Sequence, residues 1–547
     1  MDNFDHLVQG AGILAELLAA IPGIQMLVTS RERLNLLGEW VFVLECLPYP
    51  HLSEDQSQFL IDHNMRTQLE NYSAVVMFTQ CARRRDVSFR LTEENQLAVL
   101  KICQLVNGIP LALELAASWI NALSCEEIAR EIQLDASFLA ATTRDIPERH
   151  RSIRAVFDHS WKLLTNDQRL VLRQLSVFRG SFTRQAAEIV ANARLETLVS
   201  LLEKSLLHRT YTGHFELHDL IRQFTARKLE LNRQDFDQIH ARHSSYYLDL
   251  LTLREPDLRS RRKKAALDEL SSQIDDIRLA WDWATSQHQL YDLVKSAGGL
   301  LYYYDSRNLL LEGHKMFSMA LQEVSSLKYD SIVEHEGQKE IDPDIYEVAL
   351  AQMLSGSADF DIRMSRIHDG IAKLQECIPL LIKHHEEALL ADAYWRLATG
   401  FTSEGNYQEA TRAVRESIVL NRRLGRQWQE ATALLTLGLV MTHLGNHMGA
   451  HRQLEEVLRM SRELEDTRLI ILAISTLCQV KLRIGLPEEA IALLEEGYQI
   501  AMSAGDHYGI TLNLSSMANA AQSVEDFQPA KDLYQKSIER YRSSGDV

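Results

Sequence analysis

The chain has 547 residues, which is too long for one hydrophobic core, so several domains are expected. Its 58 Lys and Arg residues against 75 Asp and Glu residues give a net charge of −17, which disfavours non-specific binding of the whole chain to nucleic acid or to an anionic membrane. No apolar stretch is long enough to cross a bilayer, no basic leader begins the sequence, and the six cysteines lack C-x-x-C spacing, so we expect a cytoplasmic protein with reduced thiols.

Two short apolar segments near the N-terminus predict β-strands, over residues 25–31 and 40–44. Because helical segments separate them, a parallel α/β sheet is expected, and ligands of such sheets meet the carboxyl ends of the strands. Arg31 stands at such an end, where it would contact a terminal phosphate or form an ordinary surface salt bridge. No G-x-x-x-x-G-K-[ST] pattern occurs in the sequence, so the loop that would cradle phosphates is missing.

A helical stretch follows over residues 97–120. Its first helix is predicted to end at Asn107 and Gly108, and Pro110 begins the next helix at a position that tolerates proline. Two interpretations remain open. The segment is either a well-capped joint between two helices, or a turn whose proline packs against an adenine ring.

Helices are then predicted between residues 152 and 206, followed by a hairpin that turns at Thr212 and Gly213 and by a further helix. Three helices and a hairpin of this kind make a winged-helix module. Its candidate DNA-reading helix, residues 195–205, carries two acidic side chains against one basic one. Base reading requires Arg, Lys, Asn or Gln over a basic surface, so direct DNA binding is not expected.

The middle of the chain offers two further candidates. The dense basic run of residues 259–264 predicts a solvated turn before a helix, with a partner-docking patch as the alternative. His240 and His243 stand three residues apart on a predicted helix, without an obvious acidic or cysteine partner, and a solvated or packed pair is expected rather than a metal site. The signatures H-E-x-x-H and G-x-S-x-G are absent, so an enzyme of those classes is not indicated.

The last part of the chain is built from a regular repeat. A turn motif recurs at residues 405–407, 445–447, 485–487 and 525–527, and each is followed by an alanine: Ala410, Ala450, Ala490 and Ala530. A period of about 40 residues indicates stacked units of two helices. The pattern resembles the tetratricopeptide repeat, with longer helices than usual. Such arrays present a concave surface that binds a protein, a small ligand or a second copy of the chain.

Four short motifs together carry a wider resemblance. Residues 2–7 look like the tail of a Walker B segment, residues 29–31 resemble a sensor-1 turn, residues 108–113 resemble a G-x-P motif, and residues 217–219 resemble an M-H-D motif. In this order, ahead of tetratricopeptide repeats, they resemble the STAND signalling ATPases, and in particular the NB-ARC-like ATPases of large bacterial transcriptional regulators. Residues 275–284 also resemble the helical region that follows the winged helix in that family.

The resemblance implies roles for four residues in binding ATP or ADP. Asp2 would hold Mg²⁺, Arg31 would touch the γ-phosphate, Pro110 would flank the adenine, and His218 would contact the β-phosphate of ADP. The chain departs from the family pattern because the strand before Asp2 and the phosphate loop are missing. ATP, ADP and Mg²⁺ are therefore expected in an intact relative, while tight binding by this chain alone, and ATPase activity, are not.

The predicted fold class is mainly α, with a partial α/β NTPase remnant, a helical arm, a winged helix and an α-solenoid. Three functions remain open: a STAND-type regulator that couples ligand sensing by the repeats to an incomplete ATP/ADP switch, a protein–protein interaction scaffold, and part of a transcriptional regulator whose effector lies elsewhere. Self-association is a further expectation, and membrane binding is not expected. The predicted domains are residues 1–60 (NTPase core), 61–150 (helical arm), 151–235 (winged helix), 236–385 (irregular helical repeats) and 386–547 (tetratricopeptide repeats).

Overall fold

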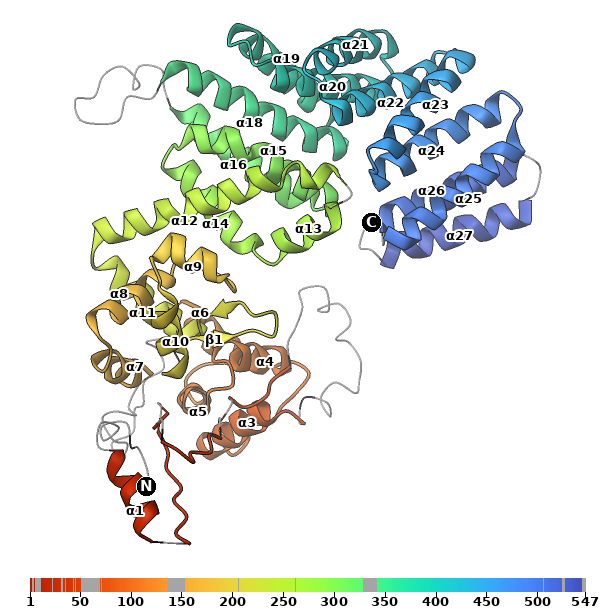
Figure 1. Cartoon of the computed structure of the whole chain (residues 1–547). Helices are drawn as coiled ribbons and strands as arrows, with labels where there is room; N and C mark the ends of the chain where they lie inside the picture. Colours follow the sequence, from red (N-terminus) through yellow and green to blue (C-terminus); the bar gives the residue numbers. More distant parts are fainter. Residues whose placement is uncertain are drawn as a thin grey trace. The chain divides into compact units, whose positions relative to one another are not determined.

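The structure, a computed structural model, is mainly helical (Figure 1). It forms two compact units, Met1–Tyr246 and Tyr247–Val547. A mainly α fold with a helical solenoid is thus confirmed. Among the described residues, no helix is both long and apolar enough to cross a membrane. The structure describes residues 1, 4, 11–21, 23–30, 33–34, 36–42, 44, 46–50, 69, 71–134, 153–204, 206–260, 262–327, 342–504, 506–523 and 527–543.

The first unit consists of short helices and one small hairpin. The last helix, α12, runs on into the second unit. The elements are α1 (Gly12–Ala20), α3 (Ser73–Arg85), α4 (Gln96–Leu105), α5 (Pro110–Ala117), α6 (Cys125–Leu134), α7 (Ile153–Lys162), α8 (Asn166–Leu175), α9 (Arg184–Ala191), α10 (Leu195–Glu203), β1 (His208–Arg209), β2 (Phe215–Glu216), α11 (Asp219–Glu230) and α12 (Arg233–Arg254).

The two strands expected over residues 25–31 and 40–44 are not formed in the described part of the chain. The amino group of Met1 donates to the carbonyl of Leu27 at 2.7 Å, and the amide of Thr29 donates to the carbonyl of Met1 at 3.0 Å. This hydrogen-bond pattern is that of a parallel pair, but no strand is formed there among the described residues. Trp40 and Phe42 are 97% and 87% exposed, because no described strand lies beside them to complete a ladder or cover their side chains.

Helices α3–α6 share one apolar core, which includes Phe78, Val99 and Leu113, all fully buried. Leu220, in the first turn of α11, also belongs to this core, so the start of α11 is anchored on helices α3–α6. The predicted hairpin is present after α10. His208 pairs with Glu216 and Arg209 pairs with Phe215, and Gly213 turns the chain with φ +86°.

The second unit is a continuous stack of helix pairs (Figure 1). Its first elements are short, and its later helices have nearly constant length. The elements are η5 (Asp257–Arg259), α13 (Lys263–Ser271), α14 (Ile274–Ser286), α15 (Leu290–Ser306), α16 (Leu310–Ser326), α18 (Pro343–Arg363), α19 (Ile367–Lys383), α20 (Glu387–Glu404), α21 (Tyr407–Arg423), α22 (Gln427–His443), α23 (His447–Glu463), α24 (Thr467–Arg483), α25 (Pro487–Ala504), α26 (His507–Ser523) and α27 (Phe527–Ser543).

The constant repeat period sets the geometry of this stack. The first helices of successive units, α20, α22, α24 and α26, begin at Glu387, Gln427, Thr467 and His507. Their second helices, α21, α23, α25 and α27, begin at Tyr407, His447, Pro487 and Phe527, in the same phase.

Small side chains allow the helices of the stack to approach closely. Ala410, Ala450 and Ala490 are fully buried, and a Cβ added to Gly438 would lie 2.6 Å from a methyl carbon of Leu454. The alanines are those that the sequence repeats every 40 residues, and the residues equivalent to Gly438 in the other units are also small: Ala398, Cys478 and Ala518. The tetratricopeptide-like repeats predicted from the sequence are therefore present.

The interior of the stack also holds charged side chains. Arg396 on α20 is 5% exposed, and its guanidinium donates to the carboxylate of Asp359 at 3.3 Å and to the hydroxyl of Ser355 at 3.1 Å. Burial raises the pKa of Asp359, and the Arg396 guanidinium opposes that rise. The two charges compensate each other where water cannot, so each depends on the other.

Candidate functional site

The G-x-P turn connects α4 to α5 through two residues in the left-handed backbone region, Asn107 with φ +49° and Gly108 with φ +64°. Asparagine and glycine are the residues that tolerate this conformation best. Gly108 is required here for a second reason, because a Cβ at this position would lie 2.0 Å from the carbonyl oxygen of Leu47. The amide of Leu47 donates to the carbonyl of Gly108 at 3.1 Å. Pro110 begins α5 as predicted, and it is exposed.

His218 precedes the first residue of α11, and its carbonyl accepts the amide of Arg222 at 2.8 Å. The side chain is 7% exposed. The buried Leu220 fixes this turn against helices α3–α6, and this places His218 beside the G-x-P turn. Two of the sequence-predicted positions therefore meet: the Nδ2 of Asn107 lies 3.3 Å from the Nδ1 of His218.

A short hydrogen-bond relay fixes the protonation of this histidine. The hydroxyl of Tyr49 donates to the Oδ1 of Asn107 at 2.8 Å, so the Nδ2 of Asn107 faces His218 and donates to its Nδ1. An imidazole that accepts at Nδ1 carries its hydrogen on Nε2. The Nε2 atom is buried, and it has no hydrogen-bond partner among the described residues. A buried donor without a partner costs about 1–3 kcal/mol, so this one is suited to a ligand that accepts.

The charge of the site follows from its burial. Burial lowers the pKa of His218 to about 4, repulsion from His208 adds to this effect, and Asp219 opposes it. His218 is therefore neutral at pH 7 and offers an N–H rather than a positive charge. Burial raises the pKa of Tyr49, and Glu216 raises it further. Tyr49 thus keeps the proton that it donates to Asn107.

The remaining sequence-predicted residues cannot be compared in the same way, because Asp2 and Arg31 lie outside the described residues. No cluster of three or more His, Cys, Asp or Glu side chains arranged to hold a metal occurs within the part of the chain that the structure describes. His243 is buried and packs its ring against Phe178, with 5.5 Å between the centroids, as expected of a packed histidine.

Sequence reasoning missed two members of the site, Asn107 and Tyr49. The sequence pattern assigns Asn107 only to a helix end, although an asparagine before Gly-x-Pro is a signal of left-handed backbone. Tyr49 carries no signal, because it reaches Asn107 across 58 positions of sequence.

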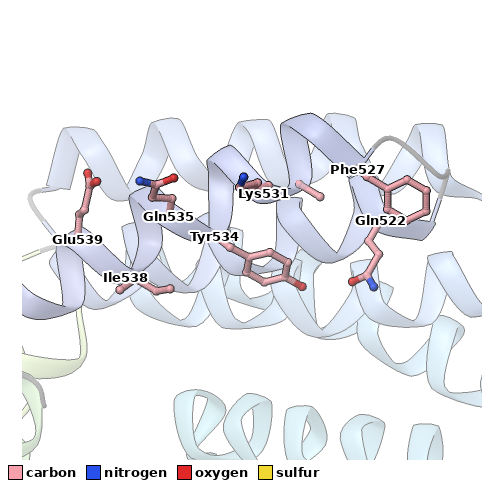
Figure 2. A pocket seen from close by; sticks show the side chains of 8 residues that line it. Gln522, Phe527, Lys531, Tyr534, Gln535, Ile538 and Glu539 are labelled. Carbon is pink, nitrogen blue, oxygen red and sulfur yellow. The ribbon is translucent and has the colours of Figure 1, made fainter.

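A separate hollow lies on α27, at the other end of the described chain (Figure 2). Apolar and polar side chains both line it, including Phe527, Tyr534, Ile538 and Lys531. It contains no buried ionisable group, and the hydroxyl of Tyr534 already donates to the side chain of Asn519. It has none of the chemistry of the His218 site.

Two kinds of known protein are similar to this chain: a family that matches only the repeats, and relatives that match most of the chain. The family described as anaphase-promoting complex subunit 5 matches residues 363–428, 425–484 and 479–523. A Mycobacterium tuberculosis H37Rv protein named as a candidate HTH-type transcriptional regulator is 26% identical over 482 residues, which are 85% of this chain and 50% of that protein. The chain thus spans about half the length of the curated relatives it matches.

Two solved structures are also similar. A STAND protein with a tetratricopeptide repeat sensor from Pyrococcus horikoshii has 15% sequence identity and a TM-score of 0.44, over 87% of this chain and 67% of its own. A Rap protein solved with competence and sporulation factor has 13% identity and a TM-score of 0.34, over 55% of this chain and 94% of its own. The Mycobacterium tuberculosis relative is named as a transcriptional regulator, which is the class of protein whose ATPases the motif order resembles.

Proposed function

We propose that this chain is the sensing and switch-controlling part of a STAND-type regulatory protein. In this proposal the repeats capture a protein or small-ligand partner, and the helical arm with α11 responds to a bound nucleotide. The observation that carries the proposal is the neutral, buried His218, whose Nε2–H has no partner among the described residues and lies beside the G-x-P turn. A phosphate oxygen is an acceptor of the right chemistry for that donor.

One feature of the residues present fits the diphosphate of ADP: the Nε2–H of His218, which has no hydrogen-bond partner among the described residues. Within the proposal His218 donates to a phosphate oxygen, Asn107 and Tyr49 hold its tautomer, and Pro110 offers an exposed ring to the adenine. Asp2 and Arg31 keep the Mg²⁺ and γ-phosphate roles that the resemblance implies. The sequence lacks a phosphate-loop pattern, so affinity for nucleotide is expected to be weak. Partner binding by the repeats would then shift the population between two arrangements.

Saturation-transfer difference NMR tests the nucleotide part, because it detects weak binding. With millimolar ADP we expect transfer to the adenine protons in the wild-type chain and its loss in His218→Ala. The matched control is His208→Ala, since the ring of His208 lies 6.2 Å from that of His218 and takes no part in the relay. Wild-type chain without any transfer, or equal transfer in both variants, would contradict the nucleotide role. Low-micromolar affinity in calorimetry would contradict the expected weakness.

The second candidate is a scaffold that only binds partners, and the regular repeat array favours it. A chain that passes the partner-binding tests but shows no transfer from ADP would support this candidate. Direct DNA reading is not part of either proposal, because Leu198 and Leu201 bury one face of α10 and the exposed face carries Leu195 and Val199. A cytoplasmic location, self-association and an effector outside this chain belong to the proposal as well.

A further inference from the structure

The basic run of residues 259–264, expected to be a solvated turn, is solvated only in part. Arg262 is 71% exposed and pairs with Asp257 at 2.6 Å, but the Arg259 side chain is only 12% exposed. The guanidinium carbon of Arg259 lies 3.8 Å from the ring centre of Tyr302 and 5.4 Å from that of Trp428. η5 thus places a cation against two aromatic rings, one of which belongs to a repeat helix, α22.

Close contacts surround Arg259 on each side. Glu255 accepts from the guanidinium at 2.6 Å, and Gly298 lets its carboxylate pack closely, because a Cβ on Gly298 would lie 2.6 Å from it. The rings of Tyr302 and Trp428 meet edge to face at 5.6 Å. A flat guanidinium fits such a site better than an ammonium group, because it stacks on rings and bonds a carboxylate at once.

The tryptophan ring is itself held in place by the next repeat. Its Nε1 donates to the carboxylate of Asp466 at 2.9 Å, and Asp466 also accepts the amide of Leu469, which caps the start of α24. Asp466 is only 3% exposed. Trp428 therefore keeps its face toward Arg259 by a contact that does not involve the basic run.

A second cation of the run approaches the same helix ends. Lys263 begins α13, and burial together with Arg468 lowers its pKa to about 8, while Asp466 and Asp506 oppose this shift. These carboxylates stand immediately before α24 and α26. The run thus presents an arginine and, four residues later, a lysine to a surface of rings and carboxylates.

The repeats contain a related contact of their own. Trp428, Arg468 and Tyr508 occupy the same position of successive units, each being the second residue of its helix. The guanidinium carbon of Arg468 lies 5.1 Å from the ring centre of Tyr508. The aromatic residue of one unit is therefore covered by a guanidinium from the array, whereas Trp428 is covered by a guanidinium from a segment that precedes the array.

We propose that Tyr302, Trp428 and Glu255 form a binding site for an arginine side chain, which the chain's own residues 257–264 occupy and for which a basic partner peptide competes. The partner would carry an arginine followed four residues later by a lysine, and the strongly acidic chain favours such a ligand. The regulatory meaning rests on the proposed sensing role of the repeats. The binding site itself does not depend on nucleotide, so the ADP experiment and the peptide experiment can fail independently.

The direct test uses a fluorescein-labelled peptide of residues 255–266 and the full chain. In fluorescence anisotropy, the double variant Arg259→Ala/Lys263→Ala should bind the peptide at least about tenfold more tightly than the wild-type chain, whose site is filled. Adding Trp428→Leu to the double variant should remove that gain, while adding Trp395→Leu should not. Trp395 is a matched control because its Nε1 donates to Thr436 in the next repeat and does not contact the basic run.

Two outcomes would overturn the proposal. One is equal peptide affinity for the wild-type chain and the double variant. The other is a peptide with lysine in place of Arg259 that binds as tightly as the original, since this would show attraction by net charge alone. Circular dichroism of each variant checks that the helices remain formed.

Limited trypsin digestion of the intact chain gives an independent measurement without added peptide. Cleavage within residues 259–264 should be several-fold faster in Trp428→Leu than in wild type or in Trp395→Leu, because the run is released from its site. Equal cleavage rates in all three proteins would mean that the aromatic site does not hold the run, and the proposal would be rejected.

Discussion

Two buried sites, one in each unit, treat their polar groups in opposite ways. In the second unit the buried Arg396 has Asp359 and Ser355 as partners, and the buried Lys481 likewise has a carboxylate partner. In the first unit the buried Nε2 of His218 has no described partner, and the neighbouring turn holds two consecutive residues in the left-handed region. A paired buried charge stabilises its surroundings, whereas an unpaired donor beside a strained turn marks a candidate ligand site. The contrast predicts different responses to mutation.

The largest effect is expected where the scaffold loses half of a buried charge pair. Arg396→Leu leaves Asp359 buried without its cation, which should cost about 3–5 kcal/mol and lower the midpoint of urea unfolding. Arg412→Leu is the control, because its side chain is 74% exposed in a surface pair with Glu409, and should change stability by less than about 1 kcal/mol. Similar losses in both variants would show that the buried pair is not special.

A comparison of Gly108 and Gly405 separates the cost of a positive φ from the cost of a steric clash at Cβ. Gly108→Ala meets both the positive φ and the carbonyl of Leu47, so we expect a loss of about 3 kcal/mol and faster hydrogen exchange in α4 and α5. Gly405→Ala has φ +83° but open space around it, and should cost only about 1 kcal/mol. Hydrogen-exchange mass spectrometry with urea unfolding measures both. Equal costs would mean that the close approach at Gly108 does not matter.

The unpaired histidine should make the first unit sensitive to acid. The native pKa of His218 is about 4 and its ordinary value is 6.5, so the unfolded state binds more protons below pH 6.5. Stability should therefore fall as the pH drops from 6.5 toward 4, and this residue alone should contribute about 2 kcal/mol between pH 8 and pH 5.

His218→Gln removes that titration, so its unfolding free energy should depend less steeply on pH than that of the wild-type chain. His240, whose pKa burial also lowers to about 4, remains in both proteins and gives the residual slope. Parallel pH profiles of wild type and variant would contradict the burial of a neutral His218.

The smallest effects are expected at helix starts, where the two units are alike. Thr165 accepts the amide of Gln168 at 3.2 Å ahead of α8, and Asn446 accepts the amide of Gly449 at 3.1 Å ahead of α23. Alanine at either position should cost about 1 kcal/mol, read from the thermal midpoint. A several-fold difference between the two losses would contradict the expectation that both caps contribute equally.

The repeats could be predicted from sequence because their signal is local and recurs in phase. An alanine that recurs every 40 residues, as Ala410 and Ala450 do, indicates a close helix contact in each unit that contains it. The strand prediction for residues 40–44 was wrong. The apolar pattern of this segment favours a strand, but a strand also needs a neighbouring strand to pair with, and the local sequence does not show whether one is present. The Arg259 site was missed for a similar reason, since its rings come from α15 and α22, far along the chain.

The candidate site shows the same boundary between local and long-range information. The motifs located Pro110 and His218, because a turn before a helix leaves a recognisable pattern. The contact between Asn107 and His218 joins residues 111 positions apart, and only packing of Leu220 into the arm brings them together. The sequence of neither motif indicates that the two residues are in contact.

The equal spacing of Ala388, Trp428, Arg468 and Tyr508 gives the array an interchangeable design. Because each of these residues is the second residue of its helix, a residue at this position can be exchanged between units without changing the buried alanines, such as Ala410, that set the helix spacing. Substitutions at this position, whether natural or engineered, can therefore change the binding specificity of the surface one repeat at a time while the helix packing stays the same.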